Sequence, residues 1–252
     1  MEEAVSVPFY LNWSLWAVVI AAIAIVLSQM PPIQTLVRRA KVEMELYSRI
    51  HITHKVGNPN VQLHLMLTNV GGRSVRIKGT TLTLKRDGKD IAVLPAQNYL
   101  QNPDDNKTTV MFTSFALKSK EEWAHIVNFL NYFSRPDEKK YKSAEALLKD
   151  DLFEKRELPE NKDRLVEAEE SHVSKFIDMF NEKFVWLPGE YELRVSVEAS
   201  DEKANTSKNY RFTLFESDSD ELSRAKEDYK LGDGIYWDSG NHPGVIVQIV
   251  ET

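Results

Sequence analysis

The sequence predicts a mainly β fold with an inserted helical segment, preceded by a single N-terminal transmembrane helix. Residues 9–29 carry no charged side chain, and the run from Leu15 to Leu27 is apolar throughout. The remaining residues are polar enough to give the whole chain a mean hydropathy of -0.40. From Lys41 onward apolar residues recur at every second position, which is the period of a strand with one buried face.

The N-terminal apolar segment has the length of a membrane span. About 20 helical residues cross a hydrocarbon layer of roughly 30 Å, and a helix satisfies its own backbone hydrogen bonds there. Tyr10, Trp13 and Trp16 lie near one end, as aromatic residues at a membrane interface do. Two other interpretations are a cleaved signal peptide, which would need a basic n-region and a small-residue cleavage site, and a buried core helix.

Basic residues indicate the orientation of the predicted span. None precedes it, whereas Arg38, Arg39 and Lys41 follow it closely, and basic flanks tend to remain in the cytosol. We therefore expect a protein of the inner (plasma) membrane of a bacterial cell, in contact with the lipid bilayer. The predicted order is an exported tail, a transmembrane helix, a juxtamembrane linker and a cytosolic domain: residues 1–8, 9–29, 30–40 and 41–252.

Small residues repeat along one side of the predicted span. They follow at steps of three, four, three and four, which places them on one helical stripe: Ser14, Ala17, Ala21, Ala24 and Ser28. Small residues let helices approach closely in lipid, so the stripe predicts a homo-oligomer. The other explanation is the Ala-rich composition of the segment alone.

Two short motifs in the β region resemble bacterial immunoglobulin-like domains. Alternating apolar residues predict strands over 42–53, 61–68, 75–84, 91–94, 187–197, 210–215 and 245–250, with Gly, Asn or Asp in the first turns. Residues 67–72 (Leu-Thr-Asn-Val-Gly-Gly) are similar to the Asn-x-Gly turn of these sandwiches, and 187–191 (Leu-Pro-Gly-Glu-Tyr) to the entry of a late strand. The resemblance covers 41–95 and 186–216, and it implies an immunoglobulin-like antiparallel β-sandwich used for protein interaction.

Helical spacing replaces the strand pattern between residues 119 and 184. Ser119 and Glu122 have the spacing of a capping box before a first helix, a short helix is expected around 144–148, and a last helix ends the insertion. Aromatic residues line the first and last helices: Trp123, Phe129, Phe133, Phe176 and Phe180. They would either pack the helices onto the sandwich or form a docking surface for a partner.

The sequence predicts no catalytic, cofactor or metal site. The six histidines lack the spacing of a zinc site, Cys is absent, and no phosphate-binding Gly-rich loop or nucleophile elbow is present. The acidic segment 216–221 lacks the ligand spacing of a calcium loop, and Asp and Ser before a helix are ordinary caps. A net charge of -6 argues against a protein that coats nucleic acid.

These observations predict a membrane-anchored interaction or assembly subunit. It would present its domain to a second protein, associate with its own copies and perform no enzymatic reaction. The alternative is a membrane effector or sensor whose domain controls oligomerisation of the transmembrane helix, up to formation of a pore. A membrane-anchored enzyme is the third possibility.

Overall fold

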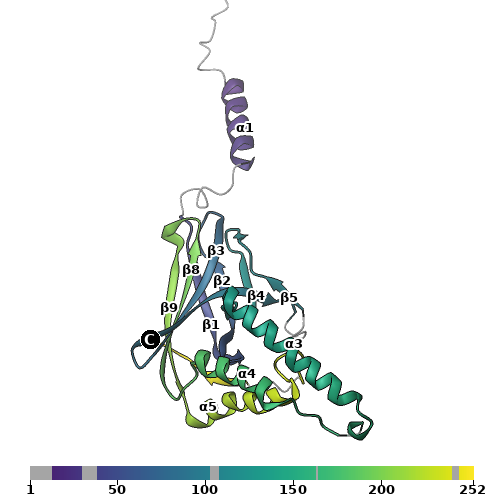
Figure 1. Ribbon diagram of the computed structural model, residues 1–252. Helices are drawn as coiled ribbons and strands as arrows, with labels where there is room; N and C mark the ends of the chain where they lie inside the picture. The colour runs from purple at the N-terminus through teal and green to yellow at the C-terminus, as the bar shows by residue number, and fades with distance from the viewer. Residues whose placement is uncertain (1–12, 30–38, 103–107, 163, 240–243) are drawn as a thin grey trace, which may run out of the picture.

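The computed structural model describes residues 13–29, 39–102, 108–162, 164–239 and 244–252. Within these residues eleven strands form one sheet, accompanied by four α-helices (Figure 1). The strands are β1 (Val42–Lys55), β2 (Asn58–Asn69), β3 (Val75–Arg86), β4 (Lys89–Leu100), β5 (Thr109–Met111), β6 (Phe115–Leu117), β7 (Glu122–Leu130), β8 (Gly189–Ala199), β9 (Thr206–Leu214), β10 (Val245–Gln248) and β11 (Val250–Glu251). The helices are α1 (Trp13–Gln29), α3 (Arg135–Glu157), α4 (Glu170–Lys183) and α5 (Glu216–Ser223), with the 3-10 helices η2 (Pro159–Asn161), η3 (Glu202–Ala204) and η4 (Arg224–Leu231).

The sheet closes almost completely on itself. Nine strands follow the order β10-β1-β2-β7-β4-β3-β8-β9-β11, while β5 pairs with β4 and β6 with β3 outside this order. Only Ile249 separates β10 from β11, yet β10 pairs with β1 and β11 pairs with β9, both antiparallel. The segment 245–251 therefore joins the two ends of the strand order, and the antiparallel sheet is nearly closed and barrel-like.

Alternating side chains fill the inside of this sheet. Along β8 every second residue from Tyr191 to Ala199 is buried, and the residues between them are exposed or half-buried. The strands expected in the sequence correspond to β1 to β4 and β8 to β11, so the strand pattern is confirmed. The predicted edge strand over 245–250 is split into two short strands that bond to different neighbours.

The expected immunoglobulin-like sandwich is wrong, and the fold is instead a mixed α/β fold built on the nearly closed sheet. Residues 89–95 of β4 pair with β3, whereas residues 96–99 of the same strand pair with β7. A sandwich keeps its two sheets separate, but here β4 on one side and segment 245–251 on the other connect them. The turn at 67–72 does form, and Asn69 stabilises it by accepting a hydrogen bond from Gly71 N–H at 3.0 Å. A local turn motif does not specify how the sheets are connected.

The expected transmembrane helix is also wrong. Among the described residues, no helix is both long enough and apolar enough to cross a membrane. The apolar segment forms α1, whose 17 residues extend over about 25 Å at about 1.5 Å per residue, against a hydrocarbon layer of roughly 30 Å. The predicted tail 1–8 and residues 30–38 of the predicted linker lie outside the described residues.

The helical insertion begins later than expected, because residues 122–130 form β7 and not a helix. Their apolar residues fit the period of a helix and that of a strand. As a strand, the segment forms hydrogen bonds with β2 on one side and β4 on the other. The predicted capping box is absent, and Ser119 Oγ donates to the Gly71 carbonyl oxygen at 2.7 Å in the turn before β7. Helix α3 spans far more of the charged stretch than the short helix expected around 144–148.

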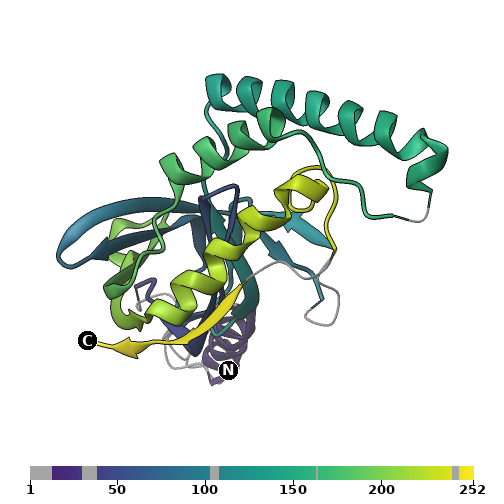
Figure 2. The ribbon, with the colours of Figure 1, turned by 60° about the horizontal axis from the view of Figure 1, so that its bottom comes forward.

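The helices between β7 and β8 form a second layer at one end of the sheet. Figure 2 shows α4 between α3 and the segment formed by α5 and η4, and α4 contacts both α3 and η4. A second hydrophobic core lies among them and includes Val56 from the turn between β1 and β2. Gly57 in that turn has φ +79°, and a Cβ atom there would lie 2.5 Å from the Phe180 carbonyl oxygen. The hairpin end is thus packed tightly against α4.

Candidate interaction surface at the seam of the sheet

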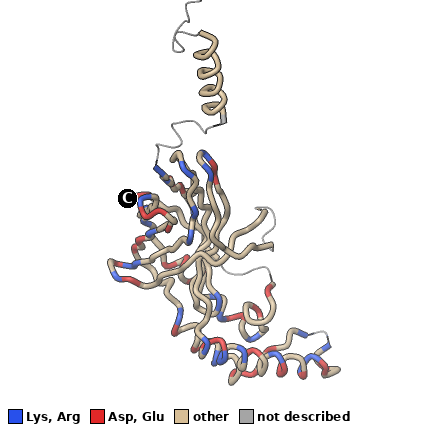
Figure 3. The backbone as a smooth tube through the Cα atoms, turned by 90° about the horizontal axis from the view of Figure 1, so that it is seen from above, with Lys and Arg blue, Asp and Glu red and all other residues tan. Residues whose placement is uncertain are grey.

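The residues predicted to mediate self-association lie together on α1. All five are exposed: Ser14, Ala17, Ala21, Ala24 and Ser28. Figure 3 shows that α1 carries no charged residue, whereas acidic and basic residues follow one another along the helical layer. Self-association through this stripe stays a prediction.

The predicted membrane-interface anchors fall into two groups. Four are described and exposed: Trp13 and Trp16 on α1, and Arg39 and Lys41 before β1. Two lie outside the described residues: Tyr10 and Arg38. Their role at a membrane interface stays a prediction.

The aromatic residues predicted to form a docking surface are not brought together. Trp123 and Phe129 lie on β7 and pack in the sheet core, where Phe129 is fully buried. Phe133, Phe176 and Phe180 belong to the core between the helices, and the last two are buried. The five side chains are therefore divided between the two cores, and they do not form one surface.

A different group of apolar side chains is exposed where the sheet closes. We call Phe215, Ile246 and Val250 the seam patch; they are 61%, 68% and 60% exposed. They come from the entrance to α5, from β10 and from β11, and all three line one hollow of about 710 Å³. Burying a large apolar side chain is worth roughly 1.5–3 kcal/mol, so this patch would contribute several kcal/mol if a partner covered it.

Charged side chains of both signs flank the seam patch on the sheet side, where Glu190 lines the same hollow as Arg211. Arg211 lies directly opposite Val250 in the pairing of β9 with β11, and it lines the same hollow. Arg211 also lines a neighbouring hollow of about 520 Å³, together with Arg194 and Lys85 on β8 and β3. Arg194 Nη2 donates a hydrogen bond to Ser207 Oγ at 3.2 Å.

Acidic side chains flank the seam patch on the helix side. Residues 216–223 form α5 and contain four acidic residues and no basic one. Asp218 lines the same hollow as the seam patch and accepts a hydrogen bond from Phe215 N–H at 3.2 Å, which caps the helix. Glu216 and Asp220 are exposed on the same helix. The patch therefore has an apolar centre surrounded by charged residues, of both signs on the sheet side and acidic on the helix side.

Two groups with shifted pKa values lie on strands next to the seam patch: His51, directly opposite Ile246, and Tyr210, directly opposite Glu251. Burial raises the pKa values of Tyr141, Tyr210 and Tyr229 above the ordinary value for a phenol. Burial lowers the pKa of His51 on β1. Within the described part of the chain, no three His, Asp or Glu side chains gather in a way that could hold a metal ion.

The seam patch was not identified from the sequence, although a signal was present. Segment 245–250 (Val-Ile-Val-Gln-Ile-Val) is apolar at both odd and even positions, and a strand with one solvent face is polar at every second position. Phe215 and Arg211 lie next to segment 245–250 only because the sheet closes, and no local sequence pattern indicates this closure. No protein-family model matches the chain, and no curated protein matches it either.

Proposed function

We propose that this protein is an interaction subunit that forms assemblies through the seam patch. The observation that carries the proposal is the gathering of Phe215, Ile246 and Val250, from three segments, in one hollow with charged flanks. An apolar centre with a polar rim is the composition of protein interfaces, and large exposed apolar side chains that lie together mark such sites.

Helix α1 supports a second contact. Its side chains are uncharged and nearly all exposed, and a helix that is apolar on every side needs apolar surroundings. This observation favours the second candidate function, an effector whose folded body controls the association of α1. Contact with a lipid bilayer, a location at the plasma membrane and the absence of a nucleic-acid partner stay predictions from the sequence.

The experiment for the seam patch is site-specific photocrosslinking in cells. A photoreactive amino acid at Ile246 is expected to give covalent adducts to protein. The same substitution at Val93, which is exposed on β4 away from the seam, is expected to give none. The absence of protein adducts at position 246 would refute the proposal.

The contact through α1 is tested separately. Changing Ala21 and Ala24 to Leu is expected to weaken association of the full chain, because bulky residues on the small-residue stripe hold helices apart. Changing Ile20 and Ile23 to Leu is the control, since it alters the same helix off the stripe. Equal association of both variants, measured by energy transfer between labelled copies, would show that the stripe has no role.

A further inference from the structure

We infer that the partner at the seam patch is an extended peptide segment of another protein, which adds as a strand between β9 and β10. The inference rests on the proposed function, because it states the conformation of the partner at the same surface. It is carried by backbone hydrogen-bonding groups of both strands, which point into the hollow beside the patch.

Strand β10 bonds to β1 through only one of its edges. Ile249 N–H donates to the Ser48 carbonyl oxygen at 2.9 Å, and the register of β10 with β1 continues from this pair. Backbone groups along a strand point to alternate edges, so those of Val247 also face β1. The N–H and C=O groups of Ile246 and Gln248 therefore point away from β1.

The pairing of β9 with the C-terminal segment stops beside the hollow. Thr252 N–H donates to the Asn209 carbonyl oxygen at 3.0 Å, and every second residue of β9 directs its backbone groups to this same edge. Those of Thr213 therefore face the seam, where the register would place them opposite Gln248. The pairing ends two residues before Thr213, because residues 245–248 bond to β1 instead.

Strands β9 and β10 therefore form the two sides of a fork. Thr213 and Gln248 line the hollow of about 710 Å³ that contains the seam patch. Among the described residues, no strand pairs with either edge at this place. Unpaired N–H and C=O groups along a strand edge are a template for the backbone of another chain, which adds as a further strand.

The free edge of β10 lacks the features that protect exposed edges from pairing. Edge strands are usually blocked by charged residues, by Pro or by a covering element. Residues 245–250 include no charged residue and no Pro, and Ile246 is exposed. A bound helix would satisfy its own backbone groups and leave this edge unpaired. An extended segment would pair with it.

The hollow also indicates which side chains the segment carries. Successive side chains of a strand point to opposite faces. On the outer face they would meet Phe215 and Ile246, which are exposed, and on the inner face Phe212 and Val247, which are buried. The four residues of β10 extend over about 13 Å at about 3.3 Å per residue. The occupant is therefore a segment of about four residues that is apolar on both faces and contains no Pro.

A second copy of this chain is a poorer match for the hollow. Each of the eleven described strands already has a neighbour in its own sheet. Supplying one of them to another molecule would break those pairs, so we assign the segment to a different protein.

The test uses the full chain in cells, with the photoreactive amino acid at Ile246. Gln248→Pro removes an N–H that points away from β1, and Pro is accepted on strand edges whose N–H faces solvent. Gln248→Thr is the matched control, because it changes the same side chain and keeps the N–H. We expect Gln248→Pro to lower the yield of protein adducts about tenfold and Gln248→Thr to lower it less than about twofold, since a backbone hydrogen bond is lost only in the first.

A second measurement does not depend on the Pro variant. The photoreactive amino acid is placed at Ile246 in one variant and at Gln248 in another, and the captured partner residues are mapped by mass spectrometry. An added strand predicts that these partner residues lie two apart in one Pro-free segment, because paired strands keep a common register. Melting temperatures within a few degrees of one another show that the variants remain folded, and if Gln248→Pro melts lower, the mapped positions decide.

Three outcomes would overturn the inference. The Pro and Thr variants could give equal adduct yields, the captured residues could be scattered over the partner, or the adducts could map to this chain itself. In each case adducts still form at Ile246, so the inference fails while the proposed function stands. Absence of any protein adduct at Ile246 would remove both.

Discussion

The two hydrophobic cores of the molecule are built on different kinds of element, and both contain buried aromatic side chains with polar atoms. The sheet core is made by inward-facing strand residues such as Leu65, Leu82 and Val195, which are fully buried and have no polar atoms in their side chains. The helix core contains Tyr141 and Tyr229, and both are almost completely buried. Tyr141 Oη donates a hydrogen bond to the Ile235 carbonyl oxygen at 2.6 Å, and in the sheet core Tyr191 Oη donates to the Leu187 carbonyl oxygen at 2.7 Å. Both cores therefore combine apolar area with polar contacts.

Polar side chains also hold the two cores together. His54 on β1 is buried, and its Nδ1 accepts a hydrogen bond from Gly57 N–H at 3.2 Å. Its Nε2 therefore carries the proton and donates to the Leu222 carbonyl oxygen of α5 at 2.8 Å. The ring makes edge contacts with Phe180 and Phe184, at centroid distances of 5.2 and 5.5 Å.

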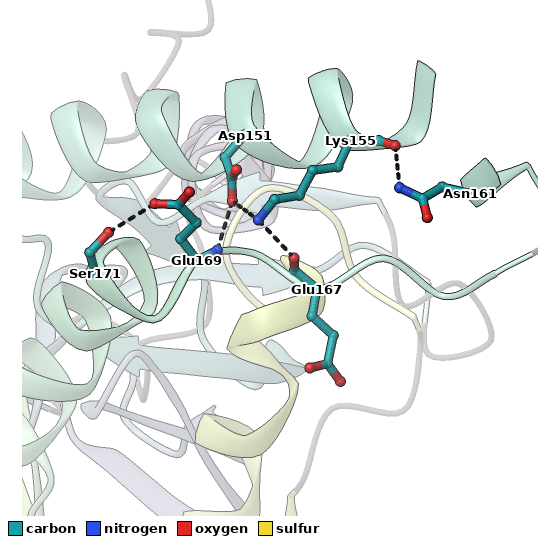
Figure 4. A network of polar contacts seen from close by, with 6 residues as sticks. All are labelled: Asp151, Lys155, Asn161, Glu167, Glu169 and Ser171. Atoms are coloured by element: carbon teal, nitrogen blue, oxygen red, sulfur yellow. Dashed lines mark hydrogen bonds and ion pairs between the residues drawn. The ribbon is translucent and has the colours of Figure 1, made fainter. Parts of the chain in front are cut away.

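A network of polar side chains lies at the outer edge of the helix core. In Figure 4, Asp151 of α3 accepts hydrogen bonds from Glu169 N–H (2.7 Å) and from Lys155 Nζ (3.0 Å). Lys155 Nζ also donates to the Glu167 carbonyl oxygen at 3.2 Å, and Asn161 Nδ2 donates to the Lys155 carbonyl oxygen at 2.8 Å. Hydrogen bonds and the buried side chain of Val166 therefore hold the chain between α3 and α4. The comparison predicts that changes in the sheet core unfold the sheet, whereas changes in the helix core or its polar network loosen the helical layer first.

The largest expected effect is in the sheet core. Leu65→Ala removes a fully buried side chain from β2 and is expected to lower the free energy of unfolding by about 3–5 kcal/mol, because a cavity remains. Denaturant titration followed by circular dichroism measures this change. A loss below about 1 kcal/mol would mean that the sheet core is loosely packed.

The matched change in the helix core is Leu148→Ala on α3, where the Leu is also fully buried. We expect a loss of about 2–4 kcal/mol for the helical layer. Hydrogen exchange should increase over α3 and α4 while β1 to β3 keep their protection, because the sheet has its own core. Equal loss of protection in the sheet would show that the two cores unfold as one unit.

The contact between the cores is tested by His54→Phe. This change keeps an aromatic ring beside Phe180 and Phe184 but leaves Gly57 N–H and the Leu222 carbonyl oxygen without their partner. We expect destabilisation by about 1–3 kcal/mol, since buried polar groups without partners are costly. Increased hydrogen exchange at α5 and the turn after β1 is the measurement. Unchanged exchange at both places would mean that ring packing alone joins the cores.

The smallest expected effect is at Asp151, where pH is the variable. Burial raises the pKa of this carboxyl, but the hydrogen bonds from Glu169 N–H and Lys155 outweigh burial and hold the pKa below its ordinary value. Because the folded pKa is the lower one, the ionised form stabilises the fold above the ordinary carboxyl pKa, and this contribution is lost as pH falls through the folded pKa.

Asp151→Asn removes this pH-dependent contribution. We expect destabilisation by about 0.5–1 kcal/mol at neutral pH, because an ion pair that remains partly accessible to solvent contributes about this much. The decline of the melting temperature between about pH 5 and pH 3, where carboxyl groups titrate, is expected to be flatter. Asp150→Asn, which changes the exposed neighbouring residue, is the control. Identical pH profiles of the Asp151 variant and the unchanged chain would show that the network has no role.

Strand positions could be predicted from the sequence because they depend on local alternation. Segments such as 61–68 and 75–84 place their apolar residues on one face whichever strand lies next to them, and both form strands. Segment 122–130 shows the limit of this reasoning. Trp123, Ile126, Val127 and Phe129 fit a helix as well as a strand, and pairing with β2 and β4 decided between the two.

The sequence by itself determined the alternation of the strands, the apolar character of α1 and the acidic composition of α5, because each is a property of residues close together in the chain. Only the tertiary structure decided that segment 245–251 bonds to β1 on one side and β9 on the other, which closes the sheet. That closure brings Phe215, Ile246 and Val250 together among charged residues. The alternation of apolar and polar residues along a segment does not indicate which distant strand that segment pairs with. The candidate interaction surface could therefore be found only in the folded structure.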